Sequence, residues 1–272
     1  MKLKILTLNL HTLQEKEIEK KNKIIADFIN EKEVDIIFFQ EVGQISEDPI
    51  YTNNIKTSNQ LLSIFPKLKR KYNYDYRYKK RGFDKYDEGL AIVSKYPIIY
   101  SDSYYLSKSK DYYNWQTRIA LLVNVDINGQ QVDLITTHLG WDSESERLDS
   151  QLANFLNVIN PRHISLCAGD FNVPYNSSYI KKIKETGLIE ASDLAGIDPT
   201  KNPTFPGILD AAPFLKTASD HQIDHIFVNK PYKVNKYEVV FKEERVSDHY
   251  GVYAEIEIYI WISKEQIQKF PY

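Results

Sequence analysis

Short apolar runs, each about as long as a single β-strand, recur along the chain and limit the folds that it can adopt. The first follows Met1, and the second, residues 34–39, is rich in isoleucine and phenylalanine. Further runs cover residues 89–94, 98–106, 118–125, 131–138, 164–169, 223–228 and 251–261. Short apolar runs rich in β-branched and aromatic residues are typical of strands. We therefore expect strands to outnumber helices.

Only a few segments have the spacing of amphipathic helices. Thr12 and Glu15 fit a capping box, and apolar residues then recur at helical spacing until about Asn30. A second capping box, Ser143 to Glu146, precedes another helical pattern. The sequence thus predicts one helix after each of these boxes.

The connections between the strands indicate the class of fold. Asn128 and Gly129 stand between two strand candidates and predict a tight hairpin, while the helical segments predict crossover connections. No linker, repeat or shift in composition marks a domain boundary. We expect residues 1–272 to form one α+β domain in which two packed sheets are flanked by helices.

Charge and hydropathy narrow the class of protein. The 272 residues include 35 Lys and Arg against 37 Asp and Glu, a formal net charge of −2. This balance is too neutral for a protein that binds nucleic acid through electrostatics alone. The N-terminus lacks a cleavage site for secretion, and no segment approaches the roughly 20 apolar residues of a membrane span. We expect a soluble, cytoplasmic protein with no membrane contact and no obligate protein partner, in which Cys167 is an inert buried thiol.

Polar side chains stand at the ends of several apolar runs. They are Asn9, Gln40-Glu41, His138, Gly169-Asp170-Phe171-Asn172, Asp224 and Ser247-Asp248-His249. One such residue alone is usually a turn former or a cap. Together they supply the oxygen ligands that Mg²⁺ prefers and two histidines that can move protons, without the Cys ligands of structural zinc sites.

The order of these clusters resembles the endonuclease/exonuclease/phosphatase superfamily over Leu6 to Val252. The matching phrases are Thr7-Leu8-Asn9, Phe39-Gln40-Glu41-Val42, Asp87 to Ile92, Thr137-His138-Leu139, Gly169 to Asn172, Ile223 to Phe227 and Ser247-Asp248-His249. The resemblance implies a four-layer α/β/β/α sandwich of two packed, mostly antiparallel sheets flanked by helices. It also implies a metal-dependent hydrolase of phosphoric esters that uses Mg²⁺, with Mn²⁺ as a possible substitute.

The resemblance also assigns a metal centre and a water-activating residue. Asn9, Glu41 and Asp248 look like metal ligands. Asp170 matches the family aspartate that orients or deprotonates the attacking water. Asn172 matches a residue that hydrogen-bonds the phosphate.

The remaining polar positions resemble groups that contact the phosphate. His138 and His249 are similar to two family histidines, each of which needs a carboxylate to fix its tautomer. By motif position, Glu88 would serve His138 and Asp224 would serve His249. Arg118 resembles an arginine that contacts substrate phosphate, a task that its forked guanidinium suits.

Three phrases are similar to a subgroup from low-GC Gram-positive bacteria that includes maltose 6'-phosphate phosphatases. They cover residues 82–92, 111–118 and 138–141. Trp115 and Trp141 in these phrases either stack on a sugar ring or base, or are ordinary aromatic residues of the core or rim. The expected activity is that of a phosphomonoesterase on a small phosphorylated sugar. The alternatives are a phosphodiesterase or nuclease with the same centre, and an inactive binding scaffold.

One segment, residues 67–81, keeps nucleic acid open as a partner, although we do not favour it. The segment holds eight Lys or Arg and has a tyrosine at every second position from Tyr72 to Tyr78. Such a row is either a basic, aromatic platform for single-stranded nucleic acid or a half-exposed strand with its tyrosines on one face. On the first interpretation Lys80 belongs to a surface that contacts nucleic acid. The near-neutral charge favours the second.

Two histidines are expected to lie outside the site. His221 ends Ser219-Asp220-His221, a copy of the later Ser-Asp-His triplet placed where the superfamily has a variable loop. His163 follows Pro161 on a helix-to-strand connection and is expected to be exposed.

Overall fold

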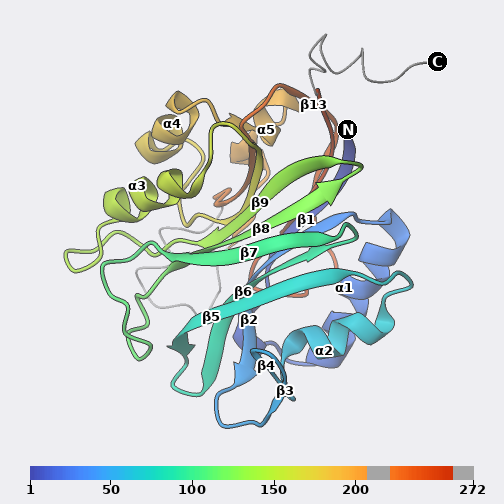
Figure 1. The fold of residues 1–272 in the computed structure, drawn as a ribbon, viewed down its shortest axis with the longest axis vertical. Coiled ribbons are helices and arrows are strands. Elements are labelled where there is room, and N and C mark those ends of the chain that lie inside the picture. The colour runs from blue at the N-terminus through green and yellow to red at the C-terminus, as the bar shows by residue number, and fades with distance from the viewer. Residues whose placement is uncertain (207–220, 260–272) are drawn as a thin grey trace.

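Two six-stranded β-sheets lie at the centre of the structure, a computed structural model that describes residues 1–206 and 221–259 (Figure 1). The first sheet has the order β13 (Tyr232–Val240), β14 (Gly251–Ile258), β1 (Lys2–Asn9), β2 (Ile36–Ile45), β6 (Tyr86–Ser94), β5 (Asn73–Gly82). The second has the order β11 (Ile189–Glu190), β12 (Asp224–Val228), β10 (Ile164–Asp170), β9 (Gln130–His138), β8 (Ile119–Ile127), β7 (Ile98–Tyr105). A short hairpin of β3 (Ile50–Thr52) and β4 (Ile55–Lys56) stands apart from both sheets.

Helices cover the outer face of each sheet (Figure 1). On the first sheet lie α1 (Ile18–Lys32) and α2 (Gln60–Ile64), and on the second lie α3 (Leu148–Val158) and α4 (Ser178–Glu185), with the short α5 (Ala191–Leu194) beside β12. Apolar side chains fill three separate layers: between α1, α2 and the first sheet, between the two sheets, and between the second sheet and α3, α4. The α+β class and the four-layer α/β/β/α sandwich are therefore confirmed.

Each sheet has one parallel pair of strands at its centre, and all its other pairs are antiparallel. In the first sheet β1 and β2 run parallel with Asn9 opposite Gln40. In the second, β9 and β10 run parallel with His138 opposite Asp170. The carboxyl ends of parallel strands meet at one edge of a sheet, and ligand sites form there. Residues far apart in the sequence thus reach the same edge.

Strand positions agree closely with the apolar runs of the sequence. The predicted hairpin joins β8 to β9, and Asn128 and Gly129 at its turn have positive φ angles of 56° and 83°. Such angles at both central residues are those of a type I′ turn, which Asn-Gly favours. The run at 251–261 forms β14 up to Ile258, and Trp261 lies outside the described residues.

The first predicted capping box is wrong. Thr12 lies in a short 3₁₀ turn, His11–Leu13, with a left-handed φ of 39°, and α1 begins only at Ile18. The Thr12 hydroxyl donates to Glu41 Oε2 at 2.9 Å instead of capping a helix. A contact with a distant strand therefore takes the side chain that the local pattern assigned to the helix.

The second predicted capping box forms only in part, since Ser143 Oγ accepts the backbone N–H of Glu146 at 3.1 Å but the Glu146 carboxylate bonds elsewhere. Helix α3 begins at Leu148, whose backbone N–H donates to Asp142 Oδ1 at 2.9 Å. Glu146 accepts hydrogen bonds from the backbone N–H groups of Lys108 and Ser109 at 2.8 and 2.7 Å. Its carboxylate thus ties the preceding loop to the segment after β7.

The tyrosine row of β5 packs into the molecule. Its rings contact the apolar layer under α1 and α2. The hydroxyl of Tyr72 donates to the carbonyl of Val34 at 2.6 Å, and that of Tyr76 to the carbonyl of Val42 at 3.2 Å. Because these rings are engaged inside the protein, the row is a half-buried strand face and does not offer an open stacking platform.

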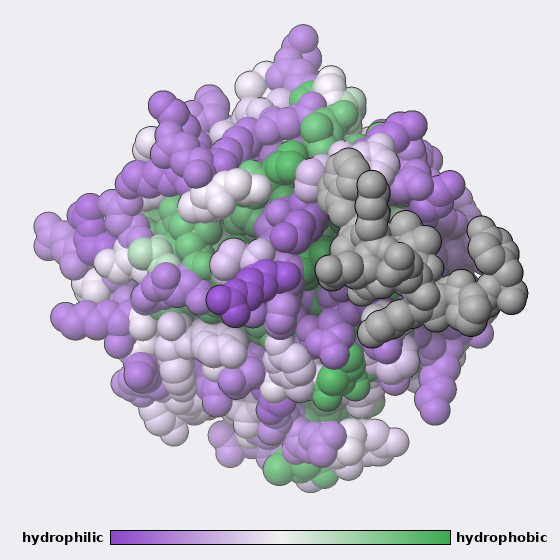
Figure 2. Space-filling view, turned by 45° about the horizontal axis from the view of Figure 1, so that its top comes forward, coloured by the Kyte–Doolittle hydropathy of each residue, from purple (hydrophilic) through white to green (hydrophobic). Residues whose placement is uncertain are grey.

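The visible surface is mostly hydrophilic, with smaller and separate hydrophobic areas (Figure 2). Among the residues that the structure describes, no helix is both long and apolar enough to cross a membrane.

Gly169 allows β9 and β10 to approach each other at the edge that carries His138 and Asp170. An added Cβ would lie 2.3 Å from the carbonyl oxygen of Thr137, which is backbone and cannot rotate away. We expect Gly169→Ala to lower the free energy of unfolding by about 1–3 kcal/mol, the usual cost of overpacking, as measured by urea denaturation.

Gly251→Ala is the matched control for this prediction. There the added Cβ meets only side-chain atoms of Val240 and Phe241, at 3.1 and 3.2 Å, which have room to adjust. Equal losses of stability in the two variants would show that the close approach at Gly169 is not the cause.

Candidate active site

The candidate active site lies where the carboxyl ends of the two parallel strand pairs face each other. The side-chain amide of Asn9 donates to Glu41 Oε1 at 3.0 Å and to Asp170 Oδ2 at 3.1 Å. A second bond between the sheets joins Gln40 Nε2 to Thr136 Oγ1 at 2.9 Å. Residues from both sheets are therefore held as one group.

Two imidazoles flank the carboxyl group of Asp170. Nε2 of His138 and Nε2 of His249 each lie 3.6 Å from Asp170 Oδ2. On its other side, His249 Nδ1 lies 2.9 Å from Asp224 Oδ2. The structure thus pairs Asp224 with His249, as the motif positions suggested.

The two imidazoles differ in charge. Burial lowers the pKa of His138 well below 6.5, and the positive charges of Arg118 and Lys80 lower it further. Burial also opposes protonation of His249, but the carboxylates of Asp224 and Asp170 outweigh it and raise the pKa of His249 well above 6.5. At neutral pH the site therefore holds one neutral imidazole and one imidazolium.

Asp170 has an unusual affinity for protons. Its side chain is almost fully buried, and burial, opposed by the charge of His249, raises the pKa of Asp170 to about 7. Its other oxygen, Oδ1, accepts the backbone N–H of Asn172 at 2.9 Å. A carboxylate whose pKa lies near neutrality is suited to take a proton from water.

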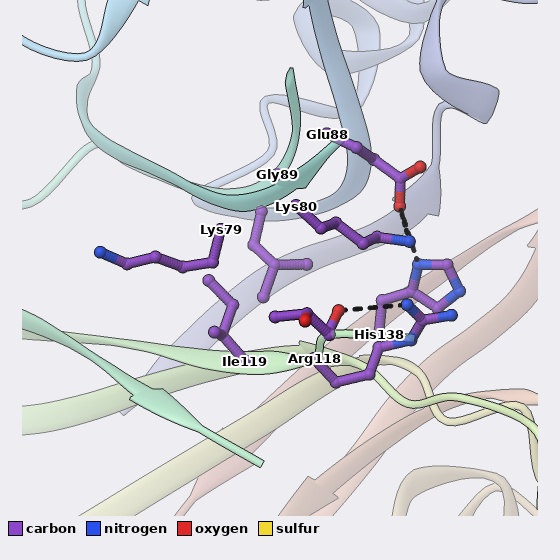
Figure 3. Close-up of a pocket in the computed structure, with 9 residues that line it drawn as sticks. Lys79, Lys80, Glu88, Gly89, Arg118, Ile119 and His138 are labelled. Carbon is purple, nitrogen blue, oxygen red and sulfur yellow. Dashed lines mark hydrogen bonds and ion pairs between the residues drawn. The ribbon is translucent and has the colours of Figure 1, made fainter. Parts of the chain in front are cut away.

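Glu88 has a different partner from the one that its motif position suggested. Its Oε1 lies 3.8 Å from His138 Nδ1, which is too long for a hydrogen bond. The same oxygen lies 2.6 Å from Nζ of Lys80, and Figure 3 shows the two side chains pointing toward each other. Glu88 is therefore the ion-pair partner of Lys80, and its pKa is lowered because the charges of Lys80 and Arg118 outweigh burial.

Lys80 is the main site residue that sequence reasoning missed. Its side chain is only 12% exposed, so it is not part of a surface open to nucleic acid. Lys80 lies opposite Glu88 in the register of β5 and β6. Counting outward from the turn after Gly82 gives the same pair, so the hairpin register was the signal that could have identified it.

The predicted metal ligands lie among crowded carboxylates. Burial and the negative charges of Glu88 and Asp248 raise the pKa of Glu41. A divalent cation would relieve this repulsion, and carboxylate oxygens suit a hard ion such as Mg²⁺. Glu41, Glu88 and His138 present ligand atoms within 4.8 Å of one another, so the residues around Glu41 fit such a cation.

Asn9 and Asp248, the other two predicted metal ligands, both lie beside His11. Asn9 turns its amide nitrogen toward Glu41, while its oxygen accepts the backbone N–H of His11 at 3.0 Å. Oδ1 of Asp248 lies 3.7 Å from Nδ1 of His11. His11, from the turn between β1 and α1, thus connects these two residues, and the sequence analysis had not included it.

The predicted substrate-binding residues surround this centre. Asn172 has a left-handed φ of 51°, and its amide donates to the carbonyl of Leu139 at 2.7 Å. The buried guanidinium of Arg118 donates to the carbonyl of Trp115 at 2.6 Å. It lines a small cavity together with His138 and Lys80 (Figure 3).

The two tryptophans differ in their placement. Trp115 is 61% exposed, and its backbone carbonyl accepts hydrogen bonds from Arg118 and Lys80. Trp141 packs against a small cluster of Phe205 and Ile223. The ring of Phe205 lies 4.9 Å from that of His249, so Trp141 stands beside the centre.

Comparison with known proteins agrees with this geometry. The model of the endonuclease/exonuclease/phosphatase family matches residues 6–249. The chain belongs to this family. A family member from Leptotrichia buccalis is 26% identical, with a TM-score of 0.84 over 94% of this chain and 100% of that one. The chain matches no curated protein.

Two more distant structures share the fold of the family. A mannosyl-6-phosphatase from Bacteroides thetaiotaomicron is 19% identical, with a TM-score of 0.70 over 94% of this chain and all of that one. TDP2 from D. rerio, in complex with a single-strand DNA product, is 16% identical, with a TM-score of 0.68 over 94% of this chain and 99% of that one. The chain is thus a metal-dependent phosphatase or phosphodiesterase of this family.

A buried histidine supports the loop that carries Asn172. His225 is fully buried, with Nδ1 3.1 Å from Glu190 Oε1 and Nε2 2.9 Å from the carbonyl of Val173. Burial opposes protonation, but the charge of Glu190 outweighs it and raises the pKa of His225. Because both ring nitrogens face an acceptor, the ring is an imidazolium that donates from both of them. The bond to Val173 holds the loop just after Asn172.

The two histidines predicted to lie outside the site have separate outcomes. His163 is only partly exposed, because its Nδ1 lies 2.8 Å from Oδ2 of the buried Asp133, so the expected exposure is wrong. His221 pairs with Phe205 in an isolated β-bridge, and Ser219 and Asp220 lie outside the described residues.

If His249 and Asp224 act as a unit, their loss should be strongly non-additive. We expect His249→Ala and Asp224→Asn each to lower kcat severely, and the double variant to be little worse than His249→Ala alone. Steady-state hydrolysis of p-nitrophenyl phosphate measures this. Fully multiplicative losses would mean that the hydrogen bond between the two side chains has no part in turnover.

Proposed function

We propose that the protein is a Mg²⁺-dependent phosphomonoesterase that acts on a small phosphorylated sugar. The observation that carries the proposal is the placement of Asp170 between a neutral and a charged imidazole. Hydrolysis of a phosphate ester needs a group that accepts a proton from water and cationic groups for the charge that develops on the phosphoryl oxygens. Asp170 and His249 match these two requirements.

The proposed reaction gives each group a role. Asp170 takes a proton from the attacking water, whose oxygen bonds to phosphorus as the ester bond breaks, and the leaving oxygen takes a proton from the imidazolium of His249 and departs as the alcohol. His249, held by Asp224, stabilises the negative charge, and Arg118 contributes its forked guanidinium. A cation held by Glu41 with Asn9 and Asp248 would supply Lewis-acid polarisation of the phosphate.

A sugar as the rest of the substrate is supported by Trp141. A flat indole beside the centre offers an apolar face of the kind that packs on sugar rings. The mannosyl-6-phosphatase shares the fold, as does TDP2, which is solved with DNA. The burial of the tyrosine row of β5 favours the sugar over nucleic acid.

A side-by-side assay tests the proposal directly. With Mg²⁺ present, we expect release of inorganic phosphate from sugar phosphates, and much slower cleavage of bis-p-nitrophenyl phosphate, plasmid DNA and abasic DNA. Trp141→Ala should lower kcat/KM for sugar phosphates by about 10-fold, the upper range for a stacking contact, and affect p-nitrophenyl phosphate less.

Tyr100→Ala is the control for loss of an exposed aromatic ring. Tyr100 lies near the start of β7, whereas the other end of this strand pairs with Ile119, next to Arg118. Robust DNA cleavage without phosphate release would favour the nuclease alternative and refute the proposal.

Removal of one charge tests the metal centre. Glu41→Gln keeps the size of the side chain but removes a ligand charge, so the variant should need much more Mg²⁺ for half-maximal activity. A Mg²⁺ titration of initial rates measures this change, with circular dichroism to check the fold. An unchanged Mg²⁺ requirement would exclude Glu41 as a ligand.

A further inference from the structure

Lys80 enters the active site because β5 is irregular next to it. The pairing of β5 with β6 shifts between Tyr78 and Lys80, so that Tyr78 faces Gly89 and Lys80 faces Glu88. Such a bulge re-aims the side chain that follows it, and bulges are common beside active sites. The tyrosines before the bulge pack under α1 and α2, whereas Lys80 turns toward His138 (Figure 3).

The position of the Lys80 ammonium is well defined by its contacts. Nζ lies 2.6 Å from Glu88 Oε1 and 3.4 Å from the carbonyl of Trp115. The side chain of Glu88, which comes from β6, packs against β5, since a Cβ at Gly82 of β5 would lie 2.6 Å from Glu88 Oε2. An ammonium has three N–H donors, so these two acceptors leave a third for a ligand.

The cavity beside Lys80 brings four side chains with basic nitrogen atoms together. Lys79, Lys80, Arg118 and His138 line it, and its volume of about 20 Å³ has room for about one water molecule. Arg118 is the phosphate-contacting candidate and His138 flanks Asp170. Lys80, unlike Lys79, turns its ammonium toward His138 and is therefore placed to reach an oxygen of a phosphate bound at Asp170 (Figure 3).

We propose that Lys80 contacts the substrate and selects a terminal phosphate over a phosphodiester. A phosphomonoester has three non-bridging oxygens and carries nearly two negative charges at neutral pH, because its second pKa is about 6. A diester has one charge, and its third oxygen is esterified with an alkyl or aryl group. Facing that group, the third N–H of the buried ammonium would have neither a charged acceptor nor water. This inference rests on the proposed phosphomonoesterase function.

The test compares two substrates with the same leaving group, p-nitrophenyl phosphate and bis-p-nitrophenyl phosphate. Loss of a hydrogen bond to a charged group corresponds to about a 10- to 100-fold fall in kcat/KM. We expect Lys80→Gln to show this fall with the monoester and less than about a 3-fold fall with the diester. Lys80→Arg, which keeps the charge, should retain most of the monoester preference.

Lys79→Gln is the matched control. Its ammonium lies 6.0 Å from the centre of the Tyr105 ring, and Figure 3 shows the side chain pointing away from His138. Loss of this neighbouring charge should leave the ratio of kcat/KM for the monoester to that for the diester unchanged. A second measurement is independent of turnover: inorganic phosphate with Mg²⁺ should raise the melting temperature of the wild type more than that of Lys80→Gln.

The outcomes distinguish the inference from the function on which it rests. Equal losses with both substrates would mean that Lys80 only positions Glu88, and unchanged rates would mean that it has no role. Either result overturns the inference while the phosphomonoesterase stands. A wild type that cleaves only the diester refutes the function itself, before any variant is made.

Discussion

The hydrogen bonds of the Asn9 amide are the constraint on which the rest of the site depends. This single side chain joins Glu41 of the first sheet to Asp170 of the second, at 3.0 and 3.1 Å. It can do so because each sheet has its parallel pair at the centre, which brings the ends of β1 and β10 to one edge. The inter-sheet layer is apolar below this edge, so the polar groups are concentrated at its end, where burial strengthens their interactions.

Burial determines how the charges are distributed. Asp170, His138 and His249 are all largely removed from water, so each ionised group must be stabilised by a specific partner. His249 has Asp224 and is charged, whereas His138 faces the cations Arg118 and Lys80 and is neutral. Asp170 between them has a pKa of about 7. One cluster of buried groups thus contains both a proton donor and a proton acceptor near neutral pH.

Features encoded within a few residues could be predicted from the sequence, and those set by tertiary contacts could not. Apolar runs gave the strands, and Asn128-Gly129 gave a hairpin, because both depend on local periodicity and backbone angles. The capping box at Thr12 failed and that at Ser143 formed only in part, because the side chains of Thr12 and Glu146 bond to distant segments. Lys80 was assigned to the surface because the tyrosine row was extended past a bulge that re-aims the side chain, although counting from the turn after Gly82 places Lys80 opposite Glu88.

The pairing of Glu88 with Lys80 has a consequence for the two histidines. If Glu88 instead accepted a hydrogen bond from His138 Nδ1, both imidazoles would have carboxylate partners, and both would be charged. Asp170 would then lie between two cations, which would favour its ionised form and make it a weaker base. Glu88 pairs with Lys80 instead, burial and the charges of Arg118 and Lys80 lower the pKa of His138, and burial raises that of Asp170 to about 7. The ion pair of Lys80 and Glu88 therefore belongs to an arrangement in which one imidazole beside Asp170 is neutral and the other is charged.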